Sequence, residues 1–312
     1  MELKSKIYVA GHQGLVGSAL LRRLQAGGFT NFTYRTREEL DLRDQGAVAA
    51  FFQQERPEYV FLTAAKVGGI KANASKPGEF IYDNLMIQTH IIHQAYLHGV
   101  KKLLFLGSSC IYPKFSSQPM KEEYLLEGKL EPTNEPYAVA KIAGIKMCQA
   151  YNLQYGTCFI SVVPANLYGP GDNFHPEDSH VIPALLQKFH LAKVEGAPEV
   201  VVWGTGSPRR EFLYVDDMAD ACAYLMEHYN DSKIINIGGG QDLSIRELVE
   251  TVAAIVGYRG RLVYDSSQPD GMPLKSLDNC HLAALGWQAQ ITLREGLQRT
   301  YDWFCQSPWI RR

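Results

Sequence analysis

A tyrosine and a lysine in the middle of the chain are spaced for proton transfer. Tyr137 and Lys141 are one helical turn apart, and Asn134 and Pro136 before them are typical of a helix start. We therefore expect both side chains on one face of a helix, with Tyr137 in its first turn. A phenol beside an ammonium near a positive helix end should release its proton more easily, and it can exchange that proton with a sugar oxygen during hydride transfer. Alone, a Tyr and a Lys at this spacing are more often an exposed pair on an amphipathic helix, so the assignment depends on the rest of the chain.

A glycine-rich segment near the start of the chain gives the pair a context. Gly11, Gly14 and Gly17 follow a strand-like run at 6–10 and precede a run of helical spacing at 18–24. In a dinucleotide-binding turn, the first glycine allows the tight turn, the second lets backbone N–H groups approach the pyrophosphate, and the third allows close helix–strand packing. The helix N-terminus then favours the anion. The alternative is an ordinary glycine-rich turn.

The next predicted strand, 31–34, bears on the choice between NAD and NADP. An NAD-binding fold usually ends this strand with an acid that holds the ribose 2′-hydroxyl. Here Arg35 and Arg37 follow it, and guanidinium groups suit a 2′-phosphate, which favours NADP. Two solvated surface arginines are the alternative. The segment 41–44 is interpreted as a strand end and helix cap near the adenine.

Further periodic segments must position these residues. Apolar runs at 59–62, 102–106 and 159–163 predict strands, and 77–99 and 137–155 predict long helices. In open α/β sheets the ligand lies outside the carboxyl ends of the strands.

The fold class is therefore α/β, a Rossmann-type doubly wound parallel sheet, followed by a smaller mixed α/β C-terminal substrate lobe. We expect a dinucleotide-binding domain over 1–165, with returns from about 215–240, and the substrate lobe over 166–312.

Composition narrows the class of protein. The chain has 312 residues, 46% hydrophobic and 21% charged, which is an ordinary globular composition. Its net charge of −2 favours neither a nucleic-acid nor a membrane partner. The 6 cysteines form no CxxC pair, which argues against a zinc site and a disulfide framework, so no metal is expected. With no signal peptide and no apolar run of 18 residues, we expect a cytoplasmic enzyme.

Several segments carry a family resemblance. Together with the glycine turn, Ser108 and the Tyr137–Lys141 pair resemble the extended short-chain dehydrogenase/reductase superfamily. Within it, the chain resembles the GDP-L-fucose synthase family over nearly its whole length. The segments that carry this closer resemblance are Ala64–Ile70, Gly107–Lys114, Glu131–Tyr137, Asn166–Pro170, Asp172–Pro176, Ser179–Ala184 and Arg210–Phe212.

The resemblance implies an NADPH-dependent epimerase–reductase acting on GDP-4-keto-6-deoxymannose, which inverts C3 and C5 and then reduces C4. It assigns Cys110 and His180 to the base and acid of the inversions. Tyr137 would protonate the C4 oxygen, Lys141 would lower the pKa of Tyr137 and hold the nicotinamide ribose, and Ser108 would hydrogen-bond the carbonyl. From the residues alone, Cys110 fits a small buried hydrophobe and His180 a structural histidine just as well.

The resemblance also implies the binding residues. For NADP(H) they are Gly11, His12, Gln13, Gly14, Leu15, Val16, Gly17, Arg37, Asp41, Leu42, Leu106, Gly107, Lys141, Pro164, Ala165, Asn166, Leu167 and His180. For the GDP-sugar they are Lys188, Trp203, Arg210 and Asp270. Lys188 and Gln13 both stand where the family leads us to expect arginine. Lys188 keeps the charge but loses the bidentate fork, and Gln13 removes one possible contact to the NADP phosphate, which leaves more of that task to Arg37.

Other functions remain open from sequence. A 4-epimerase would keep NAD tightly bound and would not need Cys110 with His180. A dehydratase would be expected to carry an acid within the Ser108–Cys110 block, and none is there. A non-catalytic NADP sensor would be favoured by loss of Tyr137, Lys141 or Ser108, and all three are present. The resemblance further implies a homodimer.

Overall fold

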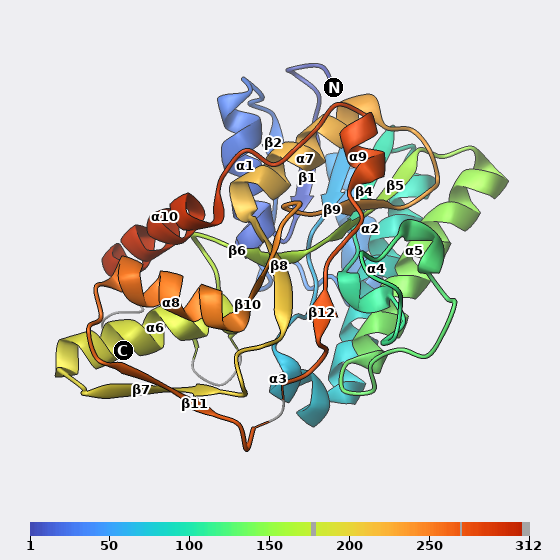
Figure 1. Ribbon diagram of the computed structural model, residues 1–312. Helices are drawn as coiled ribbons and strands as arrows, with labels where there is room; N and C mark the ends of the chain where they lie inside the picture. The colour runs from blue at the N-terminus through green and yellow to red at the C-terminus, as the bar shows by residue number, and fades with distance from the viewer. Residues whose placement is uncertain (176–178, 269, 308–312) are drawn as a thin grey trace.

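A parallel sheet forms the centre of the molecule in the computed structural model, which describes residues 1–175, 179–268 and 270–307 (Figure 1). Pro176, part of one family-like segment, lies outside the described residues. All neighbouring pairs in this sheet are parallel. In spatial order its strands are β2 (Phe32–Thr33), β1 (Ile7–Ala10), β3 (Tyr59–Leu62), β4 (Lys102–Leu106), β5 (Phe159–Pro164) and β9 (Ile235–Ile237).

The apolar runs of the sequence form these strands because both faces of the sheet are covered. Every residue of β1, β4 and β5 is buried, as expected of a parallel sheet between helices. The order reverses at β1, with β2 on one side and β3 on the other, and a doubly wound sheet binds ligands at such a point. The predicted fold class is confirmed.

Two groups of helices flank this sheet (Figure 1). α1 packs against α7, while α4 packs against both α2 and α5. In the first half of the chain the helices are α1 (Leu15–Ala26), α2 (Gln45–Glu55), α3 (Ile70–Ser75), α4 (Pro77–Leu97) and α5 (Glu135–Tyr155), with short 3₁₀ turns η1 (Ser109–Ile111) and η2 (Glu122–Tyr124).

The later part of the chain builds a second core. Buried side chains from α6, α8, α10, β7 and β8 form a hydrophobic cluster separate from that of the main sheet. The helices here are α6 (Val181–Glu195), α7 (Val215–His228), α8 (Ile245–Val256), α9 (Cys280–Ala284) and α10 (Leu293–Gln306). The strands are β6 (Asn166–Tyr168), β7 (Glu199–Trp203), β8 (Arg209–Tyr214), β10 (Asp242–Ser244), β11 (Arg261–Asp265) and β12 (Leu274–Lys275).

Two segments of this later part return to the first sheet. β9 pairs with β5, and α7 lies beside α1. In the second lobe, β8 is the central strand, because β6, β10 and β12 all pair with it. The sequence did not predict β8 or β12, whose short runs mix charged and apolar residues. No helix of the described residues is long and apolar enough to cross a membrane.

Candidate active site

The glycine turn places the start of α1 against the end of β3. Gly11 has a φ of +88°, and a Cβ there would lie 2.7 Å from the backbone nitrogen of Ala64. A Cβ on Gly17 would lie 2.1 Å from the Gly11 carbonyl oxygen, so only glycine permits this packing. Gly14 occupies the N-cap position without a side-chain cap, which leaves backbone N–H groups at the helix N-terminus for an anion. This arrangement fits a dinucleotide pyrophosphate.

Between the glycines, four side chains differ in exposure. Gln13 is exposed, Leu15 is partly buried and Val16 is buried in the core. The ring of His12 stacks on Tyr34, just after β2, with 4.5 Å between ring centroids. Burial lowers the pKa of His12, although Glu39 acts in the opposite direction. The neutral ring and Tyr34 thus form a flat edge beside the turn.

The two arginines after β2 have different surroundings. The Arg35 guanidinium donates to Glu55 at 2.6 Å and lies over the Phe51 ring, so its charge is already paired. Arg37 is exposed, and of the two it is the better placed to receive a phosphate.

The predicted helix cap in the segment 41–44 is present, but the segment itself is not a strand. The Asp44 carboxylate accepts a hydrogen bond from the Ala47 N–H at 2.9 Å and caps α2. Asp41 is bound by the Arg43 guanidinium, which lowers the pKa of that carboxyl to about 2. The Leu42 carbonyl lies 3.1 Å from His90 Nδ1 on α4.

Four of the five predicted catalytic residues, Ser108, Cys110, Tyr137 and Lys141, lie near the end of β4. Leu106 ends the strand, and the N–H of the next residue, Gly107, donates to the Val162 carbonyl at 2.8 Å. Ser108 Oγ accepts a hydrogen bond from the Cys110 N–H at 3.3 Å, which turns the chain into η1. Lys141 Nζ donates to the Leu106 carbonyl at 2.8 Å.

The predicted helix that carries Tyr137 in its first turn and Lys141 one turn later is confirmed. α5 starts at Glu135 and places Lys141 Nζ 5.9 Å from the Tyr137 ring centroid. The Tyr137 ring also contacts Phe80 edge-on.

The expected effect of Lys141 on Tyr137 was wrong. Burial raises the pKa of Tyr137, the neighbouring Cys110 raises it further, and the hydrogen bond with Ser108 only partly offsets this. Lys141 is itself buried, and desolvation lowers its pKa to about 7. At neutral pH only part of the Lys141 side chains therefore carry a charge, and Nζ donates to the Leu106 carbonyl rather than to the phenol. In this structure the phenol holds its proton, which suits an acid.

Cys110 has two polar partners that sequence analysis did not identify. Its sulfur accepts from Asn134 Nδ2 at 3.2 Å and lies 3.7 Å from Lys275 Nζ. His180 lies immediately before α6, where burial and the nearby charge of Lys275 lower its pKa. The sequence analysis used Asn134 only as a helix-start signal. Lys275 belongs to no motif, so its contact with Cys110 could be found only from the position of β12 in the fold.

The segment after β5 connects this region to the second lobe. Pro164 is the last residue of β5, and the Ala165 N–H donates to the Ile237 carbonyl at 2.9 Å. Asn166 and Leu167 form part of β6, and Asn166 Nδ2 donates to the Glu211 carbonyl at 2.9 Å. These residues join the carboxyl end of the main sheet to β8.

Three of the predicted GDP-sugar residues lie near one turn of the second lobe. The Asp270 carboxylate accepts from the Thr205 N–H and Oγ1 at 2.7 and 2.8 Å. Burial lowers the pKa of the Arg210 guanidinium on β8, and the nearby charge of Asp270 acts in the opposite direction. Trp203 is 57% exposed at the end of β7, next to this turn.

Lys188, the fourth predicted GDP-sugar residue, contacts the strand that carries Trp203. It extends from α6, and its Nζ donates to the Val201 carbonyl on the same strand as Trp203. Val201 and Trp203 share the exposed face of β7. The ammonium is thus held close to the strand surface.

Comparison with known proteins identifies the family of this chain. The model of the "NAD dependent epimerase/dehydratase family" matches residues 7–238. "GDP-L-fucose synthase 1" of Arabidopsis thaliana is 61% identical over 97% of this chain and 94% of that protein. "GDP-L-fucose synthase" of Escherichia coli K12 is 55% identical over 97% and 98%. The chain belongs to the GDP-L-fucose synthases of this family.

A solved structure of the family has the same fold. It is a GDP-L-fucose synthetase from Naegleria fowleri bound to NADP, 30% identical to this chain. The match covers 98% of this chain and 95% of that one, with a TM-score of 0.91.

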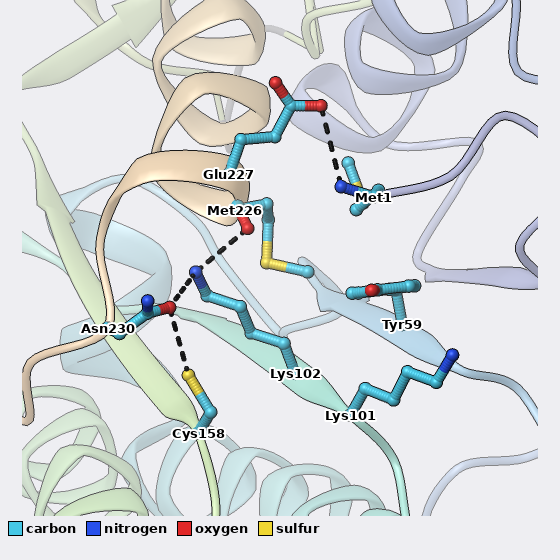
Figure 2. Close-up of a pocket in the computed structure, with 8 residues that line it drawn as sticks. All are labelled: Met1, Tyr59, Lys101, Lys102, Cys158, Met226, Glu227 and Asn230. Carbon is cyan, nitrogen blue, oxygen red and sulfur yellow. Dashed lines mark hydrogen bonds and ion pairs between the residues drawn. The ribbon is translucent and has the colours of Figure 1, made fainter.

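A cavity of about 510 Å³ is lined by residues that include Tyr59 and Lys102 (Figure 2). Tyr59 and Lys102 begin β3 and β4, so this is the amino edge of the strands. The buried Lys102 Nζ donates to the carbonyls of Leu225 and Met226 at 3.1 and 2.9 Å, and to Asn230 Oδ1 at 2.9 Å. Its charge therefore stabilises the C-terminus of α7. In the described part of the chain, no cluster of His, Cys, Asp and Glu could hold a metal ion.

Proposed function

We propose that this protein converts GDP-4-keto-6-deoxymannose into GDP-L-fucose, by inverting C3 and C5 and then reducing C4 with NADPH. The observation that carries the proposal is the meeting of Ser108, Cys110 and Tyr137 at the end of β4. A base for a carbon and an acid for an oxygen lie side by side there. Membership of the GDP-L-fucose synthases supplies the substrate.

The inversions follow from the acidity of carbons beside a carbonyl. Removal of the proton from C3 or C5 leaves an enolate, whose charge rests on the C4 oxygen. Inversion needs a base on one face and an acid on the other. In the proposed scheme Cys110 and His180 take these roles, and the Ser108 hydroxyl stabilises the C4 oxygen.

The reduction uses the same oxygen. NADPH supplies the hydride to C4. The Tyr137 phenol then gives its proton to the C4 alkoxide, a role that matches its raised pKa. Lys141, whose Nζ donates to the Leu106 carbonyl, would hold the nicotinamide ribose.

The binding assignments are part of the proposal. The glycine turn and the start of α1 would hold the pyrophosphate, and Arg37 the 2′-phosphate. Arg210 would meet the GDP diphosphate, Trp203 would offer a flat apolar surface, and Lys188 would add a point charge.

The organisation of the molecule is also proposed. The cofactor domain would comprise 1–165 with returns from about 215–240, and the substrate lobe 166–312. We further propose that the enzyme works in the cytoplasm as a homodimer.

The test is NADPH oxidation by the purified protein with GDP-4-keto-6-deoxymannose, with each sugar product identified by NMR. Wild type should yield GDP-L-fucose. Cys110→Ser should slow the inversions by about 10²-fold or more and release a C4-reduced, unepimerised sugar. Tyr137→Phe should lose reduction by a similar factor while remaining folded.

One control variant and two possible outcomes with wild type decide the test. Cys305→Ser changes an exposed cysteine on α10 and should match wild type. If folded wild type consumes no NADPH with this substrate, the proposal is wrong. If it reduces the sugar without inverting C3 and C5, the protein is a C4 reductase and the epimerase part of the proposal is wrong.

A further inference from the structure

The sulfur of Cys110 has contacts that come from both lobes. Asn134, whose Nδ2 lies 3.2 Å from the sulfur, immediately precedes α5 in the first lobe. Lys275, whose Nζ lies 3.7 Å from it, is on β12 in the second. The roles proposed above use neither side chain. Their convergence on one sulfur therefore needs its own explanation.

Asn134 does not do what an asparagine at this position usually does. It occupies the N-cap position of α5, where an Asn side chain normally accepts a hydrogen bond from the first helical turn. Here no side-chain cap forms, and the amide N–H groups face Cys110 instead. A donor aimed at sulfur requires the sulfur to accept, and a thiolate accepts far better than a thiol.

Lys275 is held in place by backbone pairing. β12 runs parallel to β8 with Lys275 opposite Arg210, and the Leu277 N–H donates to the buried Glu211 carboxylate at 2.7 Å. Within residues 1–175, 179–268 and 270–307, no carboxylate lies within ion-pair distance of Lys275 Nζ. Its charge therefore acts on the nearby sulfur without a competing acid.

Two other titratable groups belong to the same surroundings. The Tyr137 phenol on α5 faces Cys110, and the charge on the sulfur contributes to the raised pKa of Tyr137. His180, before α6, faces Lys275, whose charge contributes to the lowered pKa of the imidazole. The charge of Lys275 thus acts on both Cys110 and His180, favouring an anion at the first and a neutral ring at the second.

We propose that Asn134 and Lys275 are positioning residues that hold Cys110 as a thiolate directed at the carbon acid. The thiolate takes the proton, so an S–H bond forms as the C–H bond breaks. The C–H electron pair becomes the C–C double bond of the enolate, and the negative charge moves to the C4 oxygen. The identity of this carbon acid rests on the proposed function, whereas the thiolate does not.

The test is the rate of iodoacetamide alkylation of Cys110 in the enzyme without substrate, followed by peptide mass spectrometry from pH 6 to 10. Lys275→Met should slow alkylation about tenfold or more at pH 7, with the difference closing at high pH, where the thiol ionises unaided. Lys275→Arg should restore most of the rate. Asn134→Ala should slow it about threefold, since one hydrogen bond to the anion is lost.

The controls separate this from a folding defect. Alkylation of the exposed Cys305 in the same samples should not change, and Lys233→Met, which removes an exposed lysine elsewhere, should leave Cys110 as reactive as in wild type. If Lys275→Met unfolds the protein, Lys275→Gln is measured in its place. Unchanged alkylation of Cys110 in the folded lysine variants overturns the proposal.

A second measurement addresses catalysis. Exchange of the C3 and C5 hydrogens of the keto sugar with D₂O should slow in Lys275→Met in proportion to the loss of alkylation. A higher KM with unchanged alkylation would instead make Lys275 a diphosphate ligand and refute the positioning role. Because alkylation needs no substrate, failure of wild type to make GDP-L-fucose would sink the proposed function and leave this test standing.

Discussion

Burial decides the charge state of several individual side chains in this protein. Tyr137 and Lys141 are close, yet desolvation moves the pKa of the phenol up and that of the ammonium down, so each favours its neutral form. Proximity alone suggested the opposite for Tyr137. The phenol therefore keeps its proton at neutral pH, as the proposed acid for the C4 oxygen must.

Asp172 offers a test of the same effect on stability. It is 6% exposed, its Oδ2 has no partner among the described residues, and burial raises its pKa to about 7. Between the unfolded pKa of about 4 and this value, the folded protein binds a proton that the unfolded chain does not. Stability should therefore fall as pH rises through this window.

Asp172→Asn removes that titration. The free energy of unfolding of the variant, relative to wild type, should rise between pH 4 and pH 8 by up to about 4 kcal/mol. Urea unfolding at several pH values measures it. Glu127→Gln, at an exposed acid, should show no such trend. A constant difference between Asp172→Asn and wild type would contradict the assigned protonation.

At the scale of elements, the close approach of α5 to β4 fixes the catalytic geometry. A Cβ on Gly144 would lie 2.4 Å from Phe105 Cζ and 2.9 Å from Gln88 Oε1. Gly144 is three residues beyond Lys141 on the same helix. Any shift of α5 at this point therefore moves Lys141 relative to the end of β4.

Gly144→Ala should lower stability and activity together. Alanine gains about 1 kcal/mol of helix propensity, but the clash should outweigh it and cost about 1–3 kcal/mol net. Gly78→Ala is the matched control, because Gly78 also lies in a helix and a Cβ there would meet nothing within 4 Å. Thermal unfolding and NADPH oxidation measure both effects. If Gly144→Ala has the stability and activity of wild type, the close packing of Gly144 on Phe105 does not fix the position of α5.

At the scale of the whole molecule, Glu211 connects three distant segments. Its side chain is 1% exposed and accepts from the Leu277 N–H, the Gly240 N–H and Asn279 Nδ2 at 2.7, 2.8 and 3.0 Å. It thereby holds β8, the turn after β9 and the segment after β12 in register. Arg210 lies on β8, and Lys275 is the last residue of β12, directly before the third of these segments.

Glu211→Gln should weaken this connection. An amide NH₂ cannot accept, so at least one of the buried N–H donors loses its partner, at a cost of about 1–3 kcal/mol. We expect a lower urea midpoint and a higher KM for the GDP-sugar. Glu250→Gln, on the exposed face of α8, should change neither. A normal KM in a destabilised Glu211→Gln would separate stability from substrate binding.

Local signals in the sequence were sufficient for the first lobe. The glycine turn, the apolar strands and the helices 77–97 and 135–155 follow from short-range patterns, because a buried parallel strand is continuously apolar and a helix repeats every turn. The assignment to the GDP-L-fucose synthases was also available, since whole segments of this chain resemble that family.

The surroundings of the reactive groups were decided by the tertiary structure alone. Lys275 meets Cys110 across 165 positions of sequence, and Arg35 is taken up by Glu55, so neither contact leaves a local pattern. The pKa of Tyr137 depends on how deeply α5 packs, which composition does not state. Sequence determined which chemical groups this protein has and on which elements, whereas packing determined their charge and their partners, because desolvation and Coulomb energies depend on distances through space.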